Sequence, residues 1–125
     1  DLAGKYGAWV HIVHTPHPQT VAFAMGSVTG YHVATAMPDP AEVRKTAVMM
    51  LEKASGIAAD SGQADVTTHI GSGDAAEALT AYAASVGADL IVTGRRGLGN
   101  LSALMLGSTS QSVAHKASCA HLTVT

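Results

Sequence analysis

The sequence predicts an α/β domain, a doubly wound parallel sheet with helices on both of its faces. Two observations carry this prediction. Short runs of β-forming residues alternate along the chain with segments whose apolar residues have helical spacing. Asp39 and Asp74 mark helix starts, and Gly62 and Gly87 mark helix ends. Strands that alternate with helices form a parallel sheet, because each helix carries the chain back to the edge where the next strand begins.

The chain begins with a helix end and a strand. Residues 1–6, followed by Gly7, have the pattern of a last helical turn that a glycine stops. Residues 8–15 (AWVHIVHT) predict a strand, and the prolines that follow end it. Residues 16–39 show no sustained period, and a connection of that length is typically functional, mobile or partly helical in its own right.

The clearest helix in the sequence starts at Asp39 and Pro40. Aspartate is a preferred N-cap residue, and proline is favoured at the first helical position. Gly62 ends this helix. Its apolar stripe consists of Val43, Ala47, Met50, Leu51, Ala54, Ile57 and Ala58.

A second strand and helix follow. Residues 64–70 (ADVTTHI) predict the strand, which ends at Gly71. Asp74 with Glu77 three residues later has the spacing of a capping box, in which side chains satisfy the free N–H groups of the first turn. This spacing predicts a helix that runs to about Val86.

Two further strands and a short helix complete the domain. Residues 88–93 are almost continuously apolar, as expected for a strand that is buried on both faces. Residues 108–111 (STSQ) again have capping-box spacing, which predicts a short helix to about Ala117. Residues 121–125 predict the final strand.

A glycine motif between the third predicted strand and the last helix is the main functional signal. Two residues separate Gly94 from Gly97, nine separate Gly97 from Gly107, and Ser108 follows. Glycines allow tight turns and a close approach of backbone N–H groups to a ligand, and a helix N-terminus attracts anions. Ligands of doubly wound sheets bind beyond the carboxyl ends of the strands. The motif therefore predicts a cradle for the phosphates of a nucleotide.

This motif resembles the signature Gly-x2-Gly-x9-Gly-(Ser/Thr) of the ATP-binding branch of the universal stress protein family. The preceding run ADLIVTGRRG and the terminal strand after Ser118-Cys119-Ala120 are also similar to that family. The resemblance covers essentially the whole chain. It implies a single domain over residues 1–125 with the adenine nucleotide α-hydrolase-like fold and the family strand order 3-2-1-4-5.

The resemblance also implies an ATP site, with Mg²⁺ carried in by the nucleotide and with no catalytic residue. Gly94 and Gly97 would contact the ribose and phosphates through their backbone, and Arg96 would face the phosphates. Thr15 would lie beside the adenine, and Thr93 would border the ribose or the base. The start of the last helix would wrap the phosphates with N–H groups and hydroxyls, from Gly107, Ser108, Thr109 and Ser110.

The beginning of the chain departs from the family pattern. Family members begin with a strand that ends in an acidic residue and contacts the adenine-ribose end of the nucleotide. Residues 1–7 (DLAGKYG) match the end of the helix after that strand. We therefore expect a unit of roughly 30 residues, with the central strand, to be absent. A direct pairing of residues 8–15 with residues 88–93 would contradict this expectation.

Composition excludes several classes of function. A net charge of −2 and 4% aromatic residues argue against nucleic-acid binding. A single cysteine, Cys119, excludes an internal disulfide and predicts a reducing compartment. No apolar run approaches the roughly 20 residues that cross a bilayer, and no signal-peptide pattern opens the chain, so we expect a cytoplasmic protein without a membrane partner.

The histidines do not predict a metal site. His11, His14 and His17 recur every three residues, but His11 and His14 point to opposite faces of a strand and could not share one ion.

Three functional hypotheses remain open. The first is an ATP-binding regulatory protein of the stress response, whose conformation or oligomeric state follows the nucleotide. Hydrolysis would be slow or absent, because no general base or Walker-type lysine is in place. The second is a dimerisation module of the same family that binds no nucleotide. The third is an adenylating-type enzyme, which would need a Ser-Gly-Gly-rich loop that this sequence lacks.

The last predicted strand also suggests a homodimer. Residues 121–125 end the chain at a sheet edge, and exposed edges pair with other copies. The family commonly dimerises through this strand.

Overall fold

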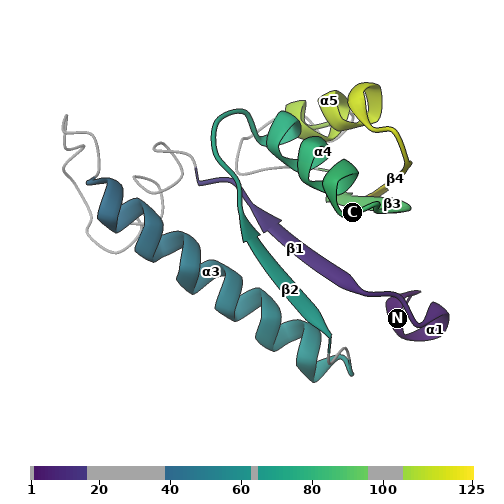
Figure 1. Ribbon diagram of the computed structural model, residues 1–125, viewed down its shortest axis with the longest axis horizontal. Helices are drawn as coiled ribbons and strands as arrows, with labels where there is room; N and C mark the ends of the chain where they lie inside the picture. The colour runs from purple at the N-terminus through teal and green to yellow at the C-terminus, as the bar shows by residue number, and fades with distance from the viewer. Residues whose placement is uncertain (1, 17–38, 63–64, 96–105) are drawn as a thin grey trace. The chain divides into compact units, whose positions relative to one another are not determined.

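A computed structural model describes residues 2–16, 39–62, 65–95 and 106–125 (Figure 1). Its strands pair in parallel and alternate with helices, so the predicted α/β class is confirmed. The chain forms two compact units, residues 1–71 and residues 72–125, and each is described by itself. The prediction of one domain over the whole chain remains a prediction. The long connection expected over residues 16–39 lies almost entirely outside the described residues.

The first unit pairs two parallel strands beside a long helix. Helix α1 (Leu2–Tyr6) leads into strand β1 (Val10–His14), which pairs with β2 (Val66–Ile70). The register matches the first residues of both strands and runs to their last residues. Gly7 ends α1 with φ +60°, a conformation that glycine adopts without strain, as the sequence predicts. Helix α3 (Pro40–Asp60) packs against both strands.

Helix α3 begins as its sequence predicts. The Asp39 side chain accepts a hydrogen bond of 2.9 Å from the Ala41 N–H, and Pro40 is the first helical residue. Ala47 and Leu51 are buried. The predicted apolar stripe is too wide, because Met50 is 37% and Ile57 59% exposed. Each lies about 100° or more around the helix from Leu51, away from the strands that the helix covers.

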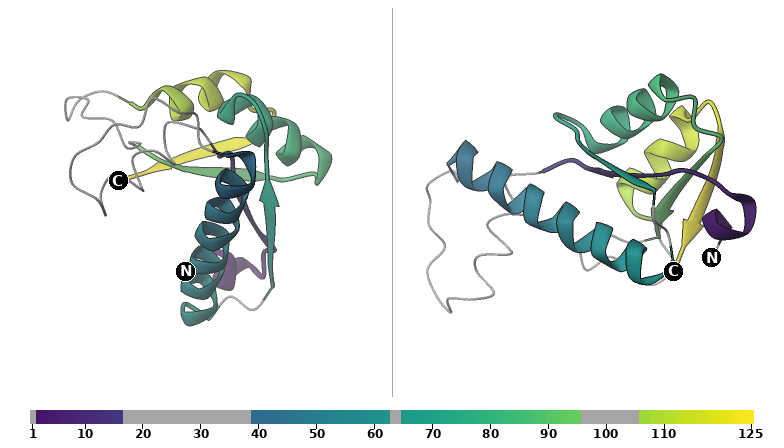
Figure 2. Two further views of the ribbon diagram at one scale, coloured as in Figure 1. Left: turned by 90° about the vertical axis from the view of Figure 1, so that its left-hand side faces the viewer. Right: turned by 60° about the horizontal axis from the view of Figure 1, so that its bottom comes forward.

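The second unit has the same layering. Helices α4 (Ala75–Ser85) and α5 (Ser108–Lys116) pack on each other and on one face of strands β3 (Leu90–Gly94) and β4 (Ala120–Val124), as Figures 1 and 2 show. The strands pair in parallel. The core between them consists of Ala76, Ala83, Ile91 and Val113, with Leu79, Ala88, Ala117 and Cys119 partly buried around it.

Strand β3 corrects one prediction from the sequence. Residues 88–93 were expected to be buried on both faces, but only Ile91 is buried, at 4% exposure. Leu90 and Val92 are 42% and 53% exposed. Successive side chains of a strand point to opposite faces, and both helices of this unit lie on the Ile91 face.

The four strands of the described residues form two separate pairs, β1–β2 and β3–β4. Among the described residues no ladder joins β1 to β3. The pairing that would have contradicted an absent central strand therefore does not occur there, and the absence itself remains a prediction. Within the described ranges, no helix combines the length and the apolar character that crossing a bilayer requires.

Candidate functional site

The end of β3 and the start of α5 lie side by side. The Arg95 N–H donates to the Val124 carbonyl at 2.7 Å, which extends the β3–β4 ladder by one bond. The Gly107 N–H then donates to the Arg95 carbonyl at 2.9 Å. These two bonds bring together the residues on either side of residues 96–105. The two ends of the glycine motif are thus adjacent in space.

A hydrogen-bonded network of side chains joins the same two elements. The Ser110 hydroxyl donates to the Gly94 carbonyl at 2.6 Å and lies 3.0 Å from the Thr93 hydroxyl. The Thr93 oxygen also lies 2.8 Å from Nε2 of His121, on β4. Ser110 is only 3% exposed, and Thr93 and His121 are half-buried. The network therefore links α5 to both strands in a place that is largely shielded from water.

The first turn of α5 has backbone donors for which the described residues offer no acceptor. Its first internal hydrogen bond runs from the Gln111 N–H to the Gly107 carbonyl at 2.9 Å, so the N–H groups of Ser108, Thr109 and Ser110 precede that ladder. No acceptor for them occurs among the described residues. Ser108 and Thr109 are exposed. Three donors without a partner among the described residues, at the positive end of a helix, form an arrangement that can hold an anion.

The helix start itself differs from the predicted capping box. Gly107, not Ser108, is the N-cap residue, and no side chain caps the helix. The bond from Gly107 to Arg95 places the glycine at the cap, and Ser108 becomes the first helical residue. The Ser108 hydroxyl therefore lies one residue after the N-cap and cannot cap the helix as the capping-box spacing predicts.

The structure brings together most of the residues that the sequence predicts for the site. Six lie at the junction of β3 and α5, namely Thr93, Gly94, Gly107, Ser108, Thr109 and Ser110. Arg96 and Gly97 fall outside the described residues. Thr15 follows β1 in the first unit and is half-buried, so it belongs to a different compact unit from the other six.

One residue of the network, His121, is not among the residues that the sequence predicts for the site. His121 shows no ligand spacing with other histidines, and nothing in the glycine motif points to it. A signal exists in the pattern of β4, where the polar residues His121 and Thr123 are half-buried and the apolar residues Leu122 and Val124 are 38% and 45% exposed. Polar side chains on the helix-facing side of a strand indicate hydrogen-bonded partners there.

The described histidines form no metal cluster. In β1, His11 and His14 lie on opposite faces because they are three residues apart. No group of three or more potential ligand side chains occurs within the described part of the chain. Partial burial lowers the pKa of His14 below its usual value of 6.5, which favours the neutral ring.

Comparison with known proteins decides the family. The model of the universal stress protein family matches residues 1–125. The chain belongs to this family. The universal stress protein YxiE of Bacillus subtilis (strain 168) is 36% identical over 83 residues, which is 66% of this chain and 55% of that protein. The chain thus spans little more than half the length of this curated relative.

Two solved structures share the fold of this universal stress protein family member. A universal stress protein crystallised in complex with cAMP superposes with a TM-score of 0.63 at 24% identity, covering 98% of this chain and 77% of the other. The hypothetical protein MJ0577 superposes with a TM-score of 0.66 at 20% identity, covering 94% and 75%. The similarity supports the α/β fold with parallel strands.

Proposed function

We propose that this protein binds an adenine nucleotide, ATP in particular, and that binding changes its conformation or oligomeric state. The observation that carries the proposal is the set of three N–H groups at the start of α5, beside the carboxyl end of β3, for which the described part of the chain holds no acceptor. A phosphate group matches these donors in charge and geometry. The complex of a related universal stress protein with cAMP supports a nucleotide as the ligand.

The site residues have distinct roles in this proposal. Ser108, Thr109 and Ser110 offer backbone N–H groups to the phosphates, and the exposed hydroxyls of Ser108 and Thr109 add further donors. Gly107 leaves the helix end open because it has no side chain. Thr93 and Gly94 border the ribose side. The family resemblance further assigns Arg96 and Gly97 to the phosphates and ribose and Thr15 to the adenine, and Mg²⁺ would enter with the nucleotide.

A second hypothesis keeps one observation in its favour. The Gly107 N–H and the Ser110 hydroxyl already have partners within the protein, so these two groups are satisfied without a ligand. This favours a dimerisation module that binds no nucleotide. In either case β4 is an edge strand of its pair, and we propose a homodimer through residues 121–125. Light scattering after size-exclusion chromatography tests the dimer.

A proline substitution tests the anion site directly. Ser108→Pro removes one N–H group but preserves the helix, because proline is favoured at the first helical position and Gly107 has the extended backbone that must precede it (φ −61°, ψ 150°). We expect the Kd for ATP, measured by calorimetry, to rise about tenfold or more, since hydrogen bonds to charged groups are stronger than neutral ones.

Two matched variants serve as controls. Ser108→Ala keeps the N–H group and removes only the hydroxyl, so its Kd should change less than that of Ser108→Pro. Ala75→Pro makes the same backbone change at the first position of α4, after Asp74 in an extended conformation, and should leave the Kd unchanged. If the wild-type protein shows neither calorimetric ATP binding nor co-purified nucleotide after denaturation, the proposal is wrong and the dimerisation module gains support.

We also propose that any hydrolysis of ATP is slow. The hydrogen bonds that the described residues form at the junction of β3 and α5 involve N–H groups, hydroxyls, carbonyls and the His121 ring, and no carboxylate takes part in them to activate a water molecule. A turnover above about 1 s⁻¹, within the usual enzyme range, would contradict this and favour an adenylating-type enzyme.

A further inference from the structure

We propose that His121 is a positioning residue for the anion site at the start of α5. Its Nε2–H begins a hydrogen-bond chain that runs in one direction through Thr93 and Ser110 to the Gly94 carbonyl. The chain locks the first turn of α5 to the end of β3. The part of the inference that concerns nucleotide affinity rests on the proposed function. The part that concerns the hydrogen-bond chain rests on its geometry alone.

The direction of the chain follows from its last member. A backbone carbonyl can only accept, so the Ser110 hydroxyl must donate its single proton in the bond of 2.6 Å to Gly94. Ser110 therefore has no proton left for its second partner. In the bond of 3.0 Å between the two hydroxyls, Thr93 must be the donor.

Counting the hydroxyl protons in the same way shows which ring nitrogen of His121 carries a proton. The single hydroxyl proton of Thr93 is directed to Ser110, so the Thr93 oxygen can only accept in its contact of 2.8 Å with His121. Nε2 of His121 must then carry a proton. In the neutral ring this leaves Nδ1 without one, and the tautomer is fixed by the network.

The fixed direction has a consequence for the ligand. The Ser110 hydroxyl has no proton to offer a phosphate, although its backbone N–H remains free. Ser110 is also almost fully buried. The anion is therefore held by backbone donors of α5, and the side chain of Ser110 holds the turn in place. Without the Nε2–H of His121, the Thr93 oxygen loses its donor and the Thr93 hydroxyl can turn away from Ser110, while the bond from Ser110 to the Gly94 carbonyl remains.

The tautomer is tested by NMR on the full chain. At about pH 8, where free histidine is neutral, long-range ¹H–¹⁵N spectra distinguish a protonated Nε2 from a protonated Nδ1. We expect the Nε2–H form for His121. Observation of the Nδ1–H form would overturn the inference.

Two substitutions test the positioning role. His121→Leu removes the donor, whereas His121→Gln keeps an N–H donor at a similar reach. For His121→Leu we expect about a tenfold rise in the Kd for ATP and faster amide exchange at Gly107, the effect of one lost hydrogen bond. His121→Gln should restore both values toward the wild type. Equal behaviour of the two variants would contradict a role for the N–H donor.

A double-mutant cycle separates the network from general destabilisation. Thr93→Val removes the next hydroxyl in the chain, so after His121→Leu it should add little to the Kd. Fully additive effects would overturn the inference. Val113→Ala weakens the same core without touching the chain, and it should leave the Kd of the folded protein unchanged. If the wild-type protein binds no ATP, the proposed function fails, while the NMR tautomer and the Gly107 exchange still decide the inference.

Discussion

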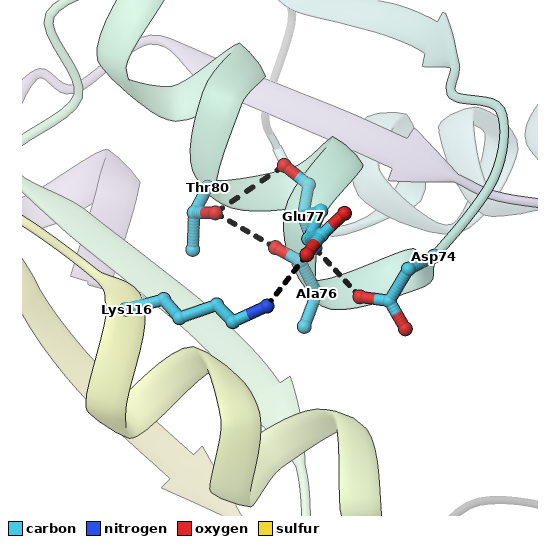
Figure 3. Close-up of polar contacts among 5 residues, drawn as sticks. All are labelled: Asp74, Ala76, Glu77, Thr80 and Lys116. Atoms are coloured by element: carbon cyan, nitrogen blue, oxygen red, sulfur yellow. Dashed lines mark hydrogen bonds and ion pairs between the residues drawn. The ribbon is translucent and has the colours of Figure 1, made fainter.

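The starts of α4 and α5 are opposite solutions to the same problem. The first turn of every helix has N–H groups without internal partners. In α4 the carboxylate of Asp74 accepts from the Glu77 N–H at 2.9 Å (Figure 3). In α5 the cap is Gly107, which has no side chain to accept anything. We call the start of α4 closed, because a carboxylate of the protein accepts from its first turn. We call the start of α5 open, because no side chain caps it and an anionic ligand could bind there.

Helix α3 follows the closed pattern. Asp39 accepts from the first turn, and Pro40 removes one of the free N–H groups. Two of the three helices that pack on strands thus carry their own carboxylate, and the third lies at the glycine motif. Among the helices α3, α4 and α5, the open end therefore occurs only at the glycine motif.

The strongest test closes the open end. Gly107→Asp should place a carboxylate where the phosphate would bind, and the backbone at this position (φ −61°) suits any residue. We expect the Kd for ATP to rise by at least about tenfold, because the new charge competes with and repels the anion. Calorimetry measures the change. Thermal unfolding should show equal or slightly higher stability, as aspartate is a good cap.

The matched control for this test is Gly107→Asn. Asparagine has the shape of aspartate and also caps helices, but it carries no charge. A smaller loss of affinity than in Gly107→Asp would show that charge matters. Equal losses would mean that the side chain only obstructs the site, and the electrostatic comparison of the two helix ends would then be wrong.

The second test opens the closed end. Asp74→Ala removes the acceptor for the Glu77 N–H, and we expect the free energy of unfolding to fall by about 1 kcal/mol. Chemical denaturation measures this loss, and Asp74→Ser should recover most of it. The Kd for ATP should not change in either variant. Tighter ATP binding in Asp74→Ala would show that α4 also offers an anion site.

The third test concerns the pH dependence of stability. It uses His14 of strand β1, which lies at neither of the two helix ends. Partial burial lowers the pKa of His14 below 6.5. As the pH falls, His14 therefore takes up a proton in the unfolded chain at a higher pH than in the folded chain. The contribution of His14 to stability is therefore present above pH 6.5 and is lost as the pH falls toward its folded pKa. Denaturation as a function of pH should show a small decline below about pH 6.5. His14→Gln should reduce the decline, and an unchanged decline would assign it to other groups.

The smallest effect is expected where the two helices meet. Lys116 of α5 contacts the Glu77 carboxylate at 2.8 Å, and both side chains are largely exposed (Figure 3). The hydrogen bond that Lys116 donates to the Glu77 carboxylate raises the pKa of Lys116, so the small contribution of this pair to stability is complete below the usual 10.5 and is lost at higher pH. Glu77→Gln should hardly change stability at neutral pH and moderate salt. A clear loss in thermal unfolding would show that this pair orders the start of α4.

Sequence patterns of short range predicted local structure well. The caps at Asp39 and Asp74 involve residues two and three positions apart, so the local sequence alone specifies them. The glycine motif likewise predicted a strand-to-helix junction, and β3 and α5 meet there, whereas a ligand site at this junction stays a prediction. Burial was predicted less well, as Val92 and Met50 show, since exposure depends on which face the neighbouring elements cover.

Residues close together in the chain specify the alternation of strands and helices, the caps at Asp39 and Asp74 and the position of the glycine motif, so these could be predicted. The cap at Gly107 and the contact of His121 with Thr93 became visible only in the folded chain. The bonds from Thr93 to Ser110 and to His121 span 17 and 28 residues. Such contacts depend on the register of β3 with β4 and on the packing of α5, which no local pattern encodes.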